Sequence, residues 1–406
     1  MTTARADTTP EAVIVHYADV AEAKYEDSLM TAKALDAAIE AFLQTPTEEA
    51  LESARAAWLA ARVPYQQTEV YRFGNAVVDD WEGRVNAWPL DEGLIDYVDA
   101  SYGSESDENS LFTANVIANS AIEINGKTID AGKITPQLIS ETLQEAGGIE
   151  ANVASGYHAI EFLLWGQDLN GNGPGAGSRP YTDYSLENCT NDNCDRRREY
   201  LAAASDLLVA DLEEMAANWK AGGAARAALE EAGVAGGLST ILTGMGSLSY
   251  GELAGERMKL GLLLGDPEEE HDCFSDNTHN SHRYDAVGIR SAYTGVYTRP
   301  DGTELTGPSL AELVSQKDPA IANELQADLD ATIAAMESMV ARAETVEAYD
   351  QMIATDNAEG NATVQAAIDG LIKQTRSIER AIAALDLGAV ELEGSDSLDS
   401  PDAVFQ

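Results

Sequence analysis

A histidine and a carboxylate stand three residues apart in residues 156–166, GYHAIEFLLWG, a segment that is otherwise almost wholly apolar. On a helix, His158 and Glu161 share one face. Burying a carboxylate without a partner is costly, so the pair predicts a bound metal, another polar group, or both. The alternative is a polar pair bonded within a helical core. The order His-x-x-Glu differs from HExxH, so a metalloprotease of that kind is not indicated.

A second candidate cluster is formed by residues 268–282, which hold three of the five histidines of the chain beside several carboxylates. Oxygen and imidazole donors of this kind suit iron, zinc or manganese. The alternative is a solvated acidic loop that caps a helix. The side chains of this cluster that we expect to line a ligand pocket are Ser275, Asp276, Asn277 and His279.

The first part of the chain offers a third set, formed by Tyr65, Glu69 and Arg72. Their spacing places all three on one helix face, either as pocket residues or as a surface ion pair. The sharper hypothesis is that Glu69 and Asp91 converge on the histidine–glutamate pair. Two further residues that we expect at the pocket are Trp88 and Glu92.

The elements that must position these residues are predicted to be mainly α-helices, because apolar residues recur at helical spacing in long segments. Two hairpins are expected, within residues 122–129 and 293–305. Two successive sets of long helices suggest two bundle-like halves, residues 10–194 and 195–390, followed by an acidic flexible tail at 391–406. The predicted helices span residues 10–43, 47–78, 111–124, 135–145, 149–165, 195–219, 236–264, 282–293, 308–345 and 358–386.

The composition is that of a globular but strongly acidic protein. Seventy acidic residues against 25 basic ones give a formal charge of −45 over 406 residues. Such a field repels nucleic acids and anionic lipid headgroups, which excludes a nucleic-acid-binding role. The charge either solubilises the surface or concentrates cations around it. The sequence contains no run of about 18 or more apolar residues, so no transmembrane segment is predicted.

The cysteines indicate in which cellular compartment the protein is found. Cys189 and Cys194 lie in a polar loop with a spacing that permits a small disulfide-closed ring, which implies an oxidising environment. The alternative is two unpaired thiols. The first residues lack the apolar core of a secretory signal. The protein is therefore either cytosolic or made with a signal that is removed, and the cysteines favour the second interpretation.

One loop is similar to a calcium-binding loop. Residues 168–172, DLNGN, alternate acidic, amide and glycine positions. The later acidic ligand at EF-hand spacing is missing, since position 179 is arginine. An EF-hand is therefore not predicted.

Three separated segments together resemble the imelysin family, and within it the iron-regulated protein A branch. Residues 156–161, GYHAIE, match the GxHxxE motif of the family. Residues 84–92, RVNAWPLDE, and 273–279, CFSDNTH, resemble the other characteristic segments of that branch. The similarity covers most of the chain, roughly residues 15 to 390.

The resemblance implies two four-helix-bundle-like halves, from a probable internal duplication, with a pocket between them. It also implies an extracytoplasmic protein, periplasmic or associated with the outer membrane, that works with the components of bacterial iron uptake. The pocket would bind a metal ion, iron or zinc, or an iron chelate. The motif carries over to His158 and Glu161 as the metal site, with Glu69 and Asp91 as candidate co-ligands.

Two other functions stay open at this point. Members of the family have been classed as metallopeptidases, which suggests a zinc-dependent peptidase with His158 as a ligand. The aromatic residues Trp81, Trp88 and Trp165 suggest instead a metal-free module that binds a peptide or small molecule. The sequence contains no nucleophile elbow, P-loop or dinucleotide fingerprint, so a non-enzymatic binding protein is favoured.

Overall fold

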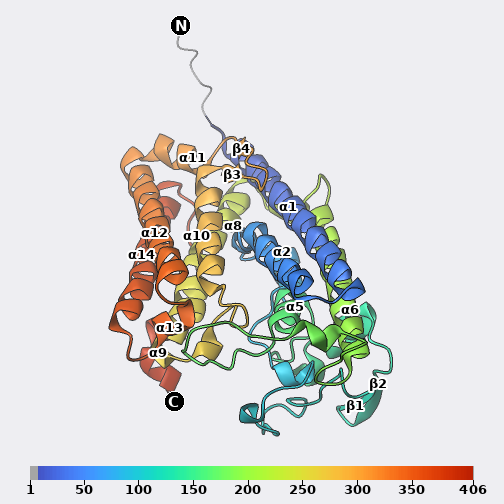
Figure 1. The fold of residues 1–406 in the computed structure, drawn as a ribbon. Helices are drawn as coiled ribbons and strands as arrows, with labels where there is room; N and C mark the ends of the chain where they lie inside the picture. The colour runs from blue at the N-terminus through green and yellow to red at the C-terminus, as the bar shows by residue number, and fades with distance from the viewer. Residues whose placement is uncertain (1–7, 406) are drawn as a thin grey trace.

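The computed structural model describes residues 8–405, and its regular secondary structure is almost entirely helical, as predicted (Figure 1). Two short antiparallel hairpins accompany them. The α-helices are α1 Pro10–Gln44, α2 Glu48–Gln66, α3 Ala76–Glu82, α4 Pro136–Leu138, α5 Gly156–Trp165, α6 Cys194–Asn218, α7 Ala224–Glu231, α8 Gly233–Ser247, α9 Leu260–Leu264, α10 Thr278–Thr294, α11 Leu310–Lys317, α12 Pro319–Thr345, α13 Tyr349–Ile353, α14 Ala358–Ala384 and α15 Asp396–Asp399. The strands are β1 Ala121–Ile124, β2 Lys127–Asp130, β3 Val296–Thr298 and β4 Glu304–Thr306.

Shorter and wider helical turns lie between these elements. The 3₁₀ turns are η1 Glu69–Tyr71, η2 Glu92–Leu94, η3 Ala100–Tyr102, η5 Ala146–Gly148, η6 Tyr181–Tyr184, η8 Pro267–Glu269 and η9 Pro401–Phe405. The π-helical segments are η4 Ile139–Leu143 and η7 Leu248–Lys259. Because η7 joins α8 to α9 directly, the segment Gly233–Leu264 is one continuous helical rod, which agrees with the helix predicted over 236–264.

The helix predicted over 149–165 begins only at Gly156, and the helix predicted over 47–78 ends at Gln66 and is followed by the separate elements η1 and α3. Two other predicted helices were wrong in part, for reasons that lie in the local chemistry. Residues 111–120 form turns, because the N–H groups of residues 115–117 donate to the carbonyl groups of residues 93–95 instead of to their own helix. The helix predicted over 308–345 is broken at Asp318. Its side chain caps the N–H groups of Ala320 and Ile321, and Pro319 takes the first helical position, where it needs no N–H partner.

The helices pack in two groups that share a continuous hydrophobic core (Figure 1). In one group α1 packs against α2 and α6, and α5 packs against both α2 and α6. In the other, α14 packs against α12 and η7. Helix α10 contacts α2 on one side and α12 on the other. The boundary predicted at 194/195 falls at the start of α6, a helix whose main partners are α1 and α5, and the division into domains stays a prediction.

Both predicted hairpins are confirmed. Strand β1 pairs with β2 across a turn in which Asn125 and Gly126 have φ of 52° and 73°. Positive φ at both central residues is the requirement that an Asn-Gly pair meets. Strand β3 pairs antiparallel with β4 across a longer loop in which Gly302 has φ of 84°. Among the described helices, none is both long enough and apolar enough to cross a membrane.

The segment predicted as a flexible tail packs in part on the rod of α8 and η7. Leu392 and Ser395 lie where Gly246 and Gly255 have no side chain. The hydroxyl of Ser397, which is 1% exposed, donates to the carbonyl of Gly255. The chain from residue 392 to 399 therefore covers one face of this rod, and the hydroxyl of Ser395 donates to Oε1 of Glu256 at 2.6 Å.

Candidate functional site

Helix α5 is fully buried and starts where the chain makes a close backbone crossing. The N–H of Tyr157 donates to the carbonyl of Val85 at 2.8 Å. Gly156 has φ of 81°, and a Cβ there would overlap the carbonyl of Val85. Trp58 on α2 donates from Nε1 to the carbonyl of Tyr157 at 2.9 Å. The glycine of the motif is therefore needed to bring α5 against residues 84–86 and to fix the direction in which it projects His158.

His158 and Glu161 form a hydrogen bond, with Nδ1 3.0 Å from Oε2 and both residues at most 1% exposed. Burial, and then the charge of Arg62, lower the pKa of His158 to about 3, so its imidazole is neutral. In the tautomer that carries its proton on Nδ1, the neutral ring donates to Oε2 of Glu161 and leaves Nε2 free to accept. Among residues 8–405, Nε2 of the same ring has no hydrogen-bond partner.

The loop before α10 brings two further donors to this ring. His271 is 2% exposed, and its ring centroid lies 4.7 Å from that of His158, with the rings nearly perpendicular. One ligand atom from each of His158, His271 and Asp272 lies within 4.8 Å of the others. Burial and the charge of Arg257 lower the pKa of His271 well below its usual value, so it too is neutral. Nδ1 of His271 lies 3.3 Å from Oδ1 of Asp272, and Nδ1 of His158 lies 4.0 Å from the same oxygen, so two imidazoles and one carboxylate lie close together.

Asp272 is held as a charged group by the residues around it. Burial alone would raise its pKa, but Arg62 at 2.8 Å lowers it well below the usual value. Ser281 and Asn277 donate to its other oxygen at 2.5 and 2.8 Å. Arg62 itself is fixed by Asn86, whose Oδ1 lies 2.6 Å from Nη1. The ionised carboxylate is thus positioned from both parts of the chain.

Glu161 connects α5 to the same loop. Its Oε1 accepts from the N–H and the hydroxyl of Ser275 at 3.0 and 2.6 Å. Burial, and then the charge of Asp272, raise the pKa of Glu161 well above its usual value. With both oxygens engaged by Ser275 and His158, Glu161 orients the imidazole ring.

The four predicted ligands do not all meet. His158 and Glu161 lie together, whereas Glu69 forms an ion pair with Arg257 at 2.7 Å. Asp91 accepts from the side chain of Asn109 at 2.5 Å. In the part of the chain that the structure describes, neither Glu69 nor Asp91 belongs to the close group around His158.

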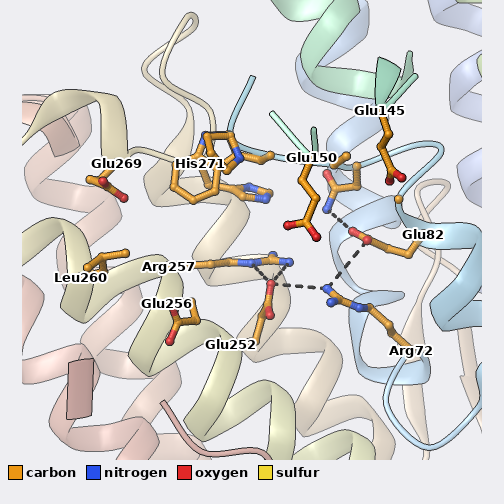
Figure 2. Close-up of a pocket in the computed structure, with 15 residues that line it drawn as sticks. Arg72, Glu82, Glu145, Glu150, Glu252, Glu256, Arg257, Leu260, Glu269 and His271 are labelled. Atoms are coloured by element: carbon orange, nitrogen blue, oxygen red, sulfur yellow. Dashed lines mark hydrogen bonds and ion pairs between the residues drawn. The ribbon is translucent and has the colours of Figure 1, made fainter. Parts of the chain in front are cut away.

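A cavity of about 550 Å³ lies beside the histidine group, and His271 reaches it (Figure 2). Figure 2 shows Arg72, Glu82, Glu252 and Arg257 joined by ion pairs where they line the cavity. Burial, and then the charge of Glu69, raise the pKa of Glu82 to about 7. The acidic residues that line the cavity are Glu82, Glu145, Glu150, Glu252, Glu256 and Glu269.

The remaining predicted pocket residues divide among three places. Arg72 and Trp88 line this cavity, and Trp88 also lines a second cavity of about 610 Å³ together with Asp91 and Glu92. Tyr65 packs against Tyr157 with ring centroids 4.7 Å apart. The others lie at the start of α10. The side chain of Asn277 donates a hydrogen bond to Asp272, and the side chain of His279 is hydrogen-bonded to that of Asn280. Asp276 has a left-handed φ of 55°.

Sequence reasoning missed His271 and Asp272 as members of the group, although both lie in the histidine-rich cluster that it singled out. Their position beside residues 273–279 was the available signal. It also missed Arg62 and Arg257, which are single basic residues in ordinary helical sequence. The sulfurs of Cys189 and Cys194 are joined as a disulfide, with Cα atoms 5.9 Å apart.

Comparison with known proteins identifies relatives of this chain. The family model described as Imelysin matches residues 21–378. A segment of 61 residues is 41% identical to a protein named iron-regulated protein A from Synechococcus elongatus, and covers 15% of this chain and 17% of that relative. The match therefore spans far less than two thirds of the relative.

Two solved structures are similar along nearly the whole chain. One is a putative iron-regulated protein A precursor from Parabacteroides distasonis, with a TM-score of 0.65 and 18% identity over 94% of this chain and 96% of that one. The other is an imelysin-like protein from Psychrobacter arcticum, with a TM-score of 0.57 and 18% identity over 95% and 98%. At this identity the likeness establishes the fold. Since the family model covers most of the sequence, the chain belongs to the imelysin family.

Proposed function

We propose that this protein is an extracytoplasmic, iron-related binding protein of bacterial iron uptake that holds a metal ion at His158, His271 and Asp272. The observation that carries the proposal is the buried Nε2 of His158, which has no hydrogen-bond partner within the described chain and stands on a residue that lies close to two other potential ligands, His271 and Asp272. A buried polar atom normally has a partner. A cation bound at this nitrogen supplies one.

The donor set fits the metals that the sequence suggested. Two neutral imidazoles and one carboxylate suit iron(II) or zinc, whereas sites for calcium and magnesium use oxygen donors. Glu161 is the orienting partner of His158, since a ligating histidine commonly donates its other N–H to a carboxylate. In this arrangement Ser275 fixes Glu161, and Arg62 and Asn277 fix Asp272.

The charge of the neighbouring cavity favours a cationic ligand. Six glutamates line it, against the guanidinium groups of Arg72 and Arg257. A cleft with an excess of one sign of charge raises the local concentration of counter-ions. The cavity therefore suits the entry of a hydrated metal ion or a positively charged chelate, and repels an anionic one.

Calorimetric titration of the metal-free protein with iron(II) under anaerobic conditions, and with zinc, tests the proposal. We expect one site in the wild type. Loss of an orienting partner typically lowers metal affinity about 10- to 100-fold, so Glu161→Gln should weaken binding by this amount and His158→Gln by at least as much. His16→Gln is the control, because His16 is also buried but bonds the carbonyl of Gly295. If His158→Gln and the wild type bound the metal with equal affinity, His158 would not be a ligand and the proposed site would be wrong.

A zinc-dependent peptidase is the second candidate, because two histidines and one carboxylate are also the donor set of some catalytic zinc sites. Catalysis needs a further group to activate water, and both oxygens of Glu161 are engaged by His158 and Ser275. Incubation of the zinc-loaded protein with unfolded substrates separates the two functions. Chelator-sensitive cleavage that Glu161→Gln abolishes would establish the peptidase.

A further inference from the structure

The second cavity, of about 610 Å³, shares Trp88 and Pro89 with the cavity beside the histidine group and is otherwise lined by different residues. Its volume falls within the range of pockets that hold small molecules, about 300–1,000 Å³. The residues that line it fall within four separate stretches of the chain, 88–92, 99–102, 167–171 and 268–273. The proposed metal centre does not account for a cavity of this size, so its lining indicates what else the protein binds.

The charged groups in the wall of the second cavity are all acidic. Five carboxylates line it, and among the described residues its lining includes no lysine, arginine or histidine. The five are Asp91, Glu92, Asp99, Asp168 and Glu268. The first cavity differs, because two arginines offset part of its negative charge. A cleft with a single sign of charge attracts ligands of the opposite sign. The second cavity therefore suits a cation.

Aromatic and aliphatic side chains form much of the remaining wall. They are Trp88, Leu90, Tyr102 and Leu169. The ring of Tyr102 is held by stacking on Phe112, with ring centroids 4.1 Å apart and an angle of 10° between the planes. An aromatic face attracts an ammonium group, and aliphatic side chains pack against methylene groups. These walls therefore suit an organic cation better than a hydrated inorganic ion.

Hydrogen bonds join three of the stretches that form the cavity. The N–H of Asp99 donates to Oε1 of Gln167 at 2.6 Å, and Nε2 of Gln167 donates to Oε1 of Glu92 at 3.5 Å. The side chain of Asn109 donates to Oδ2 of Asp91 at 2.5 Å. Glu92 is 5% exposed, so its carboxylate is held within the wall. Acidic groups positioned in advance lower the entropy cost of binding a ligand.

The carboxylates are distributed around the cavity and do not meet at one point. Among the described residues, no three of them bring a ligand atom each within 4.8 Å of one another. A calcium ion needs several oxygen ligands at about 2.3–2.6 Å, which requires such a convergence. One metal ion therefore cannot engage this set. A ligand that carries several positive charges, separated along its length, can pair with carboxylates on different parts of the wall.

We propose that the second cavity binds a linear aliphatic polyamine, a chain of ammonium groups joined by short methylene segments. The ammonium groups pair with the carboxylates, and the methylene segments lie against Trp88, Tyr102 and Leu169. The ligand neutralises a wall that has no basic side chain of its own. This site is separate from the metal centre at the histidines and takes a different class of ligand.

Calorimetric titration with spermidine, a linear triamine, tests the proposal. The full chain is titrated at neutral pH in about 0.3 M NaCl, which screens the attraction of any polyamine to the acidic surface. We expect saturable binding of one equivalent. Putrescine, a diamine, should bind at least about tenfold more weakly, because it lacks one charged hydrogen-bond donor. Magnesium at the same concentration should not displace spermidine.

Substitutions in the wall provide the decisive comparison. Glu268→Gln should weaken spermidine binding at least about tenfold, because an ammonium group loses its charged partner. Tyr102→Leu should weaken it about 2- to 30-fold through loss of the aromatic face. Glu150→Gln is the matched control, because Glu150 lines the first cavity and not the second, and should bind spermidine like the wild type. His158→Gln should also keep spermidine binding, which separates this site from the metal centre.

The thiol of Cys273 reports where the polyamine binds. Cys273 is the free cysteine of the described chain, is half-buried and lines the second cavity. Spermidine bound in the cavity should therefore slow the reaction of this thiol with N-ethylmaleimide, a neutral reagent that the acidic surface neither attracts nor repels. Saturating spermidine should lower the rate at least about fivefold in the wild type and in Glu150→Gln.

Three results would overturn the inference. They are spermidine affinity unchanged in the Glu92→Gln/Glu268→Gln double variant, absence of saturable spermidine binding at this salt concentration, and equal rates of Cys273 modification with and without spermidine. Tighter binding of magnesium than of spermidine would show that the cavity is a metal site instead. The Tm of each variant without ligand shows that it is folded, so that loss of spermidine binding reports on the cavity.

Discussion

Replacing Arg62 with methionine removes the guanidinium that compensates Asp272 at the centre of the candidate metal group. The two side chains are at most 1% exposed, and Nη2 lies 2.8 Å from Oδ1. Methionine keeps much of the volume and the apolar stem that packs among Trp58, Tyr65 and Tyr157. The change therefore tests the charge and leaves most of the packing in place.

The cost follows from the geometry of the pair. At 2.8 Å and an effective dielectric constant near 20, the attraction is about 6 kcal/mol before desolvation. Removing one partner of a buried pair typically costs about 3–5 kcal/mol, because the remaining charge has no compensation. With an unfolding entropy of about 2.1 cal/mol/K per residue, a chain of 406 residues should lose about 4–6 °C in Tm.

Differential scanning calorimetry of the metal-free protein at neutral pH measures this loss. Arg290→Met is the control, because Arg290 pairs with Asp330 at a similar 2.7 Å but both side chains are more than 40% exposed. Such a surface pair contributes about 0–1 kcal/mol. If the two variants had Tm values within about 1 °C of each other, Asp272 would not be a buried charge held by Arg62. If the metal proposal is right, zinc should raise the Tm of Arg62→Met more than that of the wild type, since the ion replaces the missing positive charge.

Three further predictions concern pH, backbone geometry and the disulfide. Burial, and then the charge of Arg257, lower the pKa of His282 to about 3, so below its ordinary pKa of about 6.5 the unfolded chain takes up a proton that the folded chain does not. Between about pH 7 and 5, the free energy of unfolding of the wild type should therefore fall by about 2 kcal/mol more than that of His282→Gln, as measured by urea unfolding. If the free energies of unfolding of the two proteins changed in parallel with pH, this prediction would be contradicted. Gly156→Ala should lower the free energy of unfolding by about 2–4 kcal/mol, because the new Cβ overlaps Val85 and φ is unfavourable for alanine. The control Gly148→Ala, at φ of 78° with open space around it, should lower it by about 1 kcal/mol. Equal losses in chemical denaturation would argue against the close backbone crossing. Reduction of the Cys189–Cys194 disulfide should lower the free energy of unfolding by about 2 kcal/mol from loop entropy alone. The Cys189→Ser/Cys194→Ser variant should have the stability of the reduced protein. A Tm unaffected by reductant would show that the disulfide does not stabilise the fold.

The sequence was sufficient where the determinants of structure are local. Helical periodicity predicted the long helices, and the Asn-Gly pair at 125–126 predicted the turn of its hairpin. Prediction failed at residues 115–117, whose N–H groups pair with residues 93–95. An apolar run does not reveal whether its backbone N–H groups bond within their own helix or to the carbonyl groups of another segment.

In the candidate site, too, the local features were predictable from the sequence and the long-range contacts were not. His158 and Glu161 were predictable because they lie one turn apart on a single helix. The other members of the group, His271 and Asp272, depend on how a loop more than 100 residues later folds back over α5. Glu69 is a buried carboxylate, and its partner, Arg257, is 188 residues away and stands on a π-helical segment whose register no simple periodicity gives. Convergence over such separations is a property of the tertiary packing.

The contact between residues 392–395 and the rod of α8 and η7 has a consequence for the order in which the pocket is assembled. Gly246, Gly251 and Gly255 leave that face of the rod with bare backbone until Leu392, Glu393 and Ser395 cover it. Glycine is the weakest helix former after proline, so this rod gains little from its own propensity. Glu256, which lines the cavity, accepts from the hydroxyl of Ser395, a residue synthesised 139 positions later. During vectorial synthesis this part of the cavity wall is therefore among the last parts of the molecule to become native.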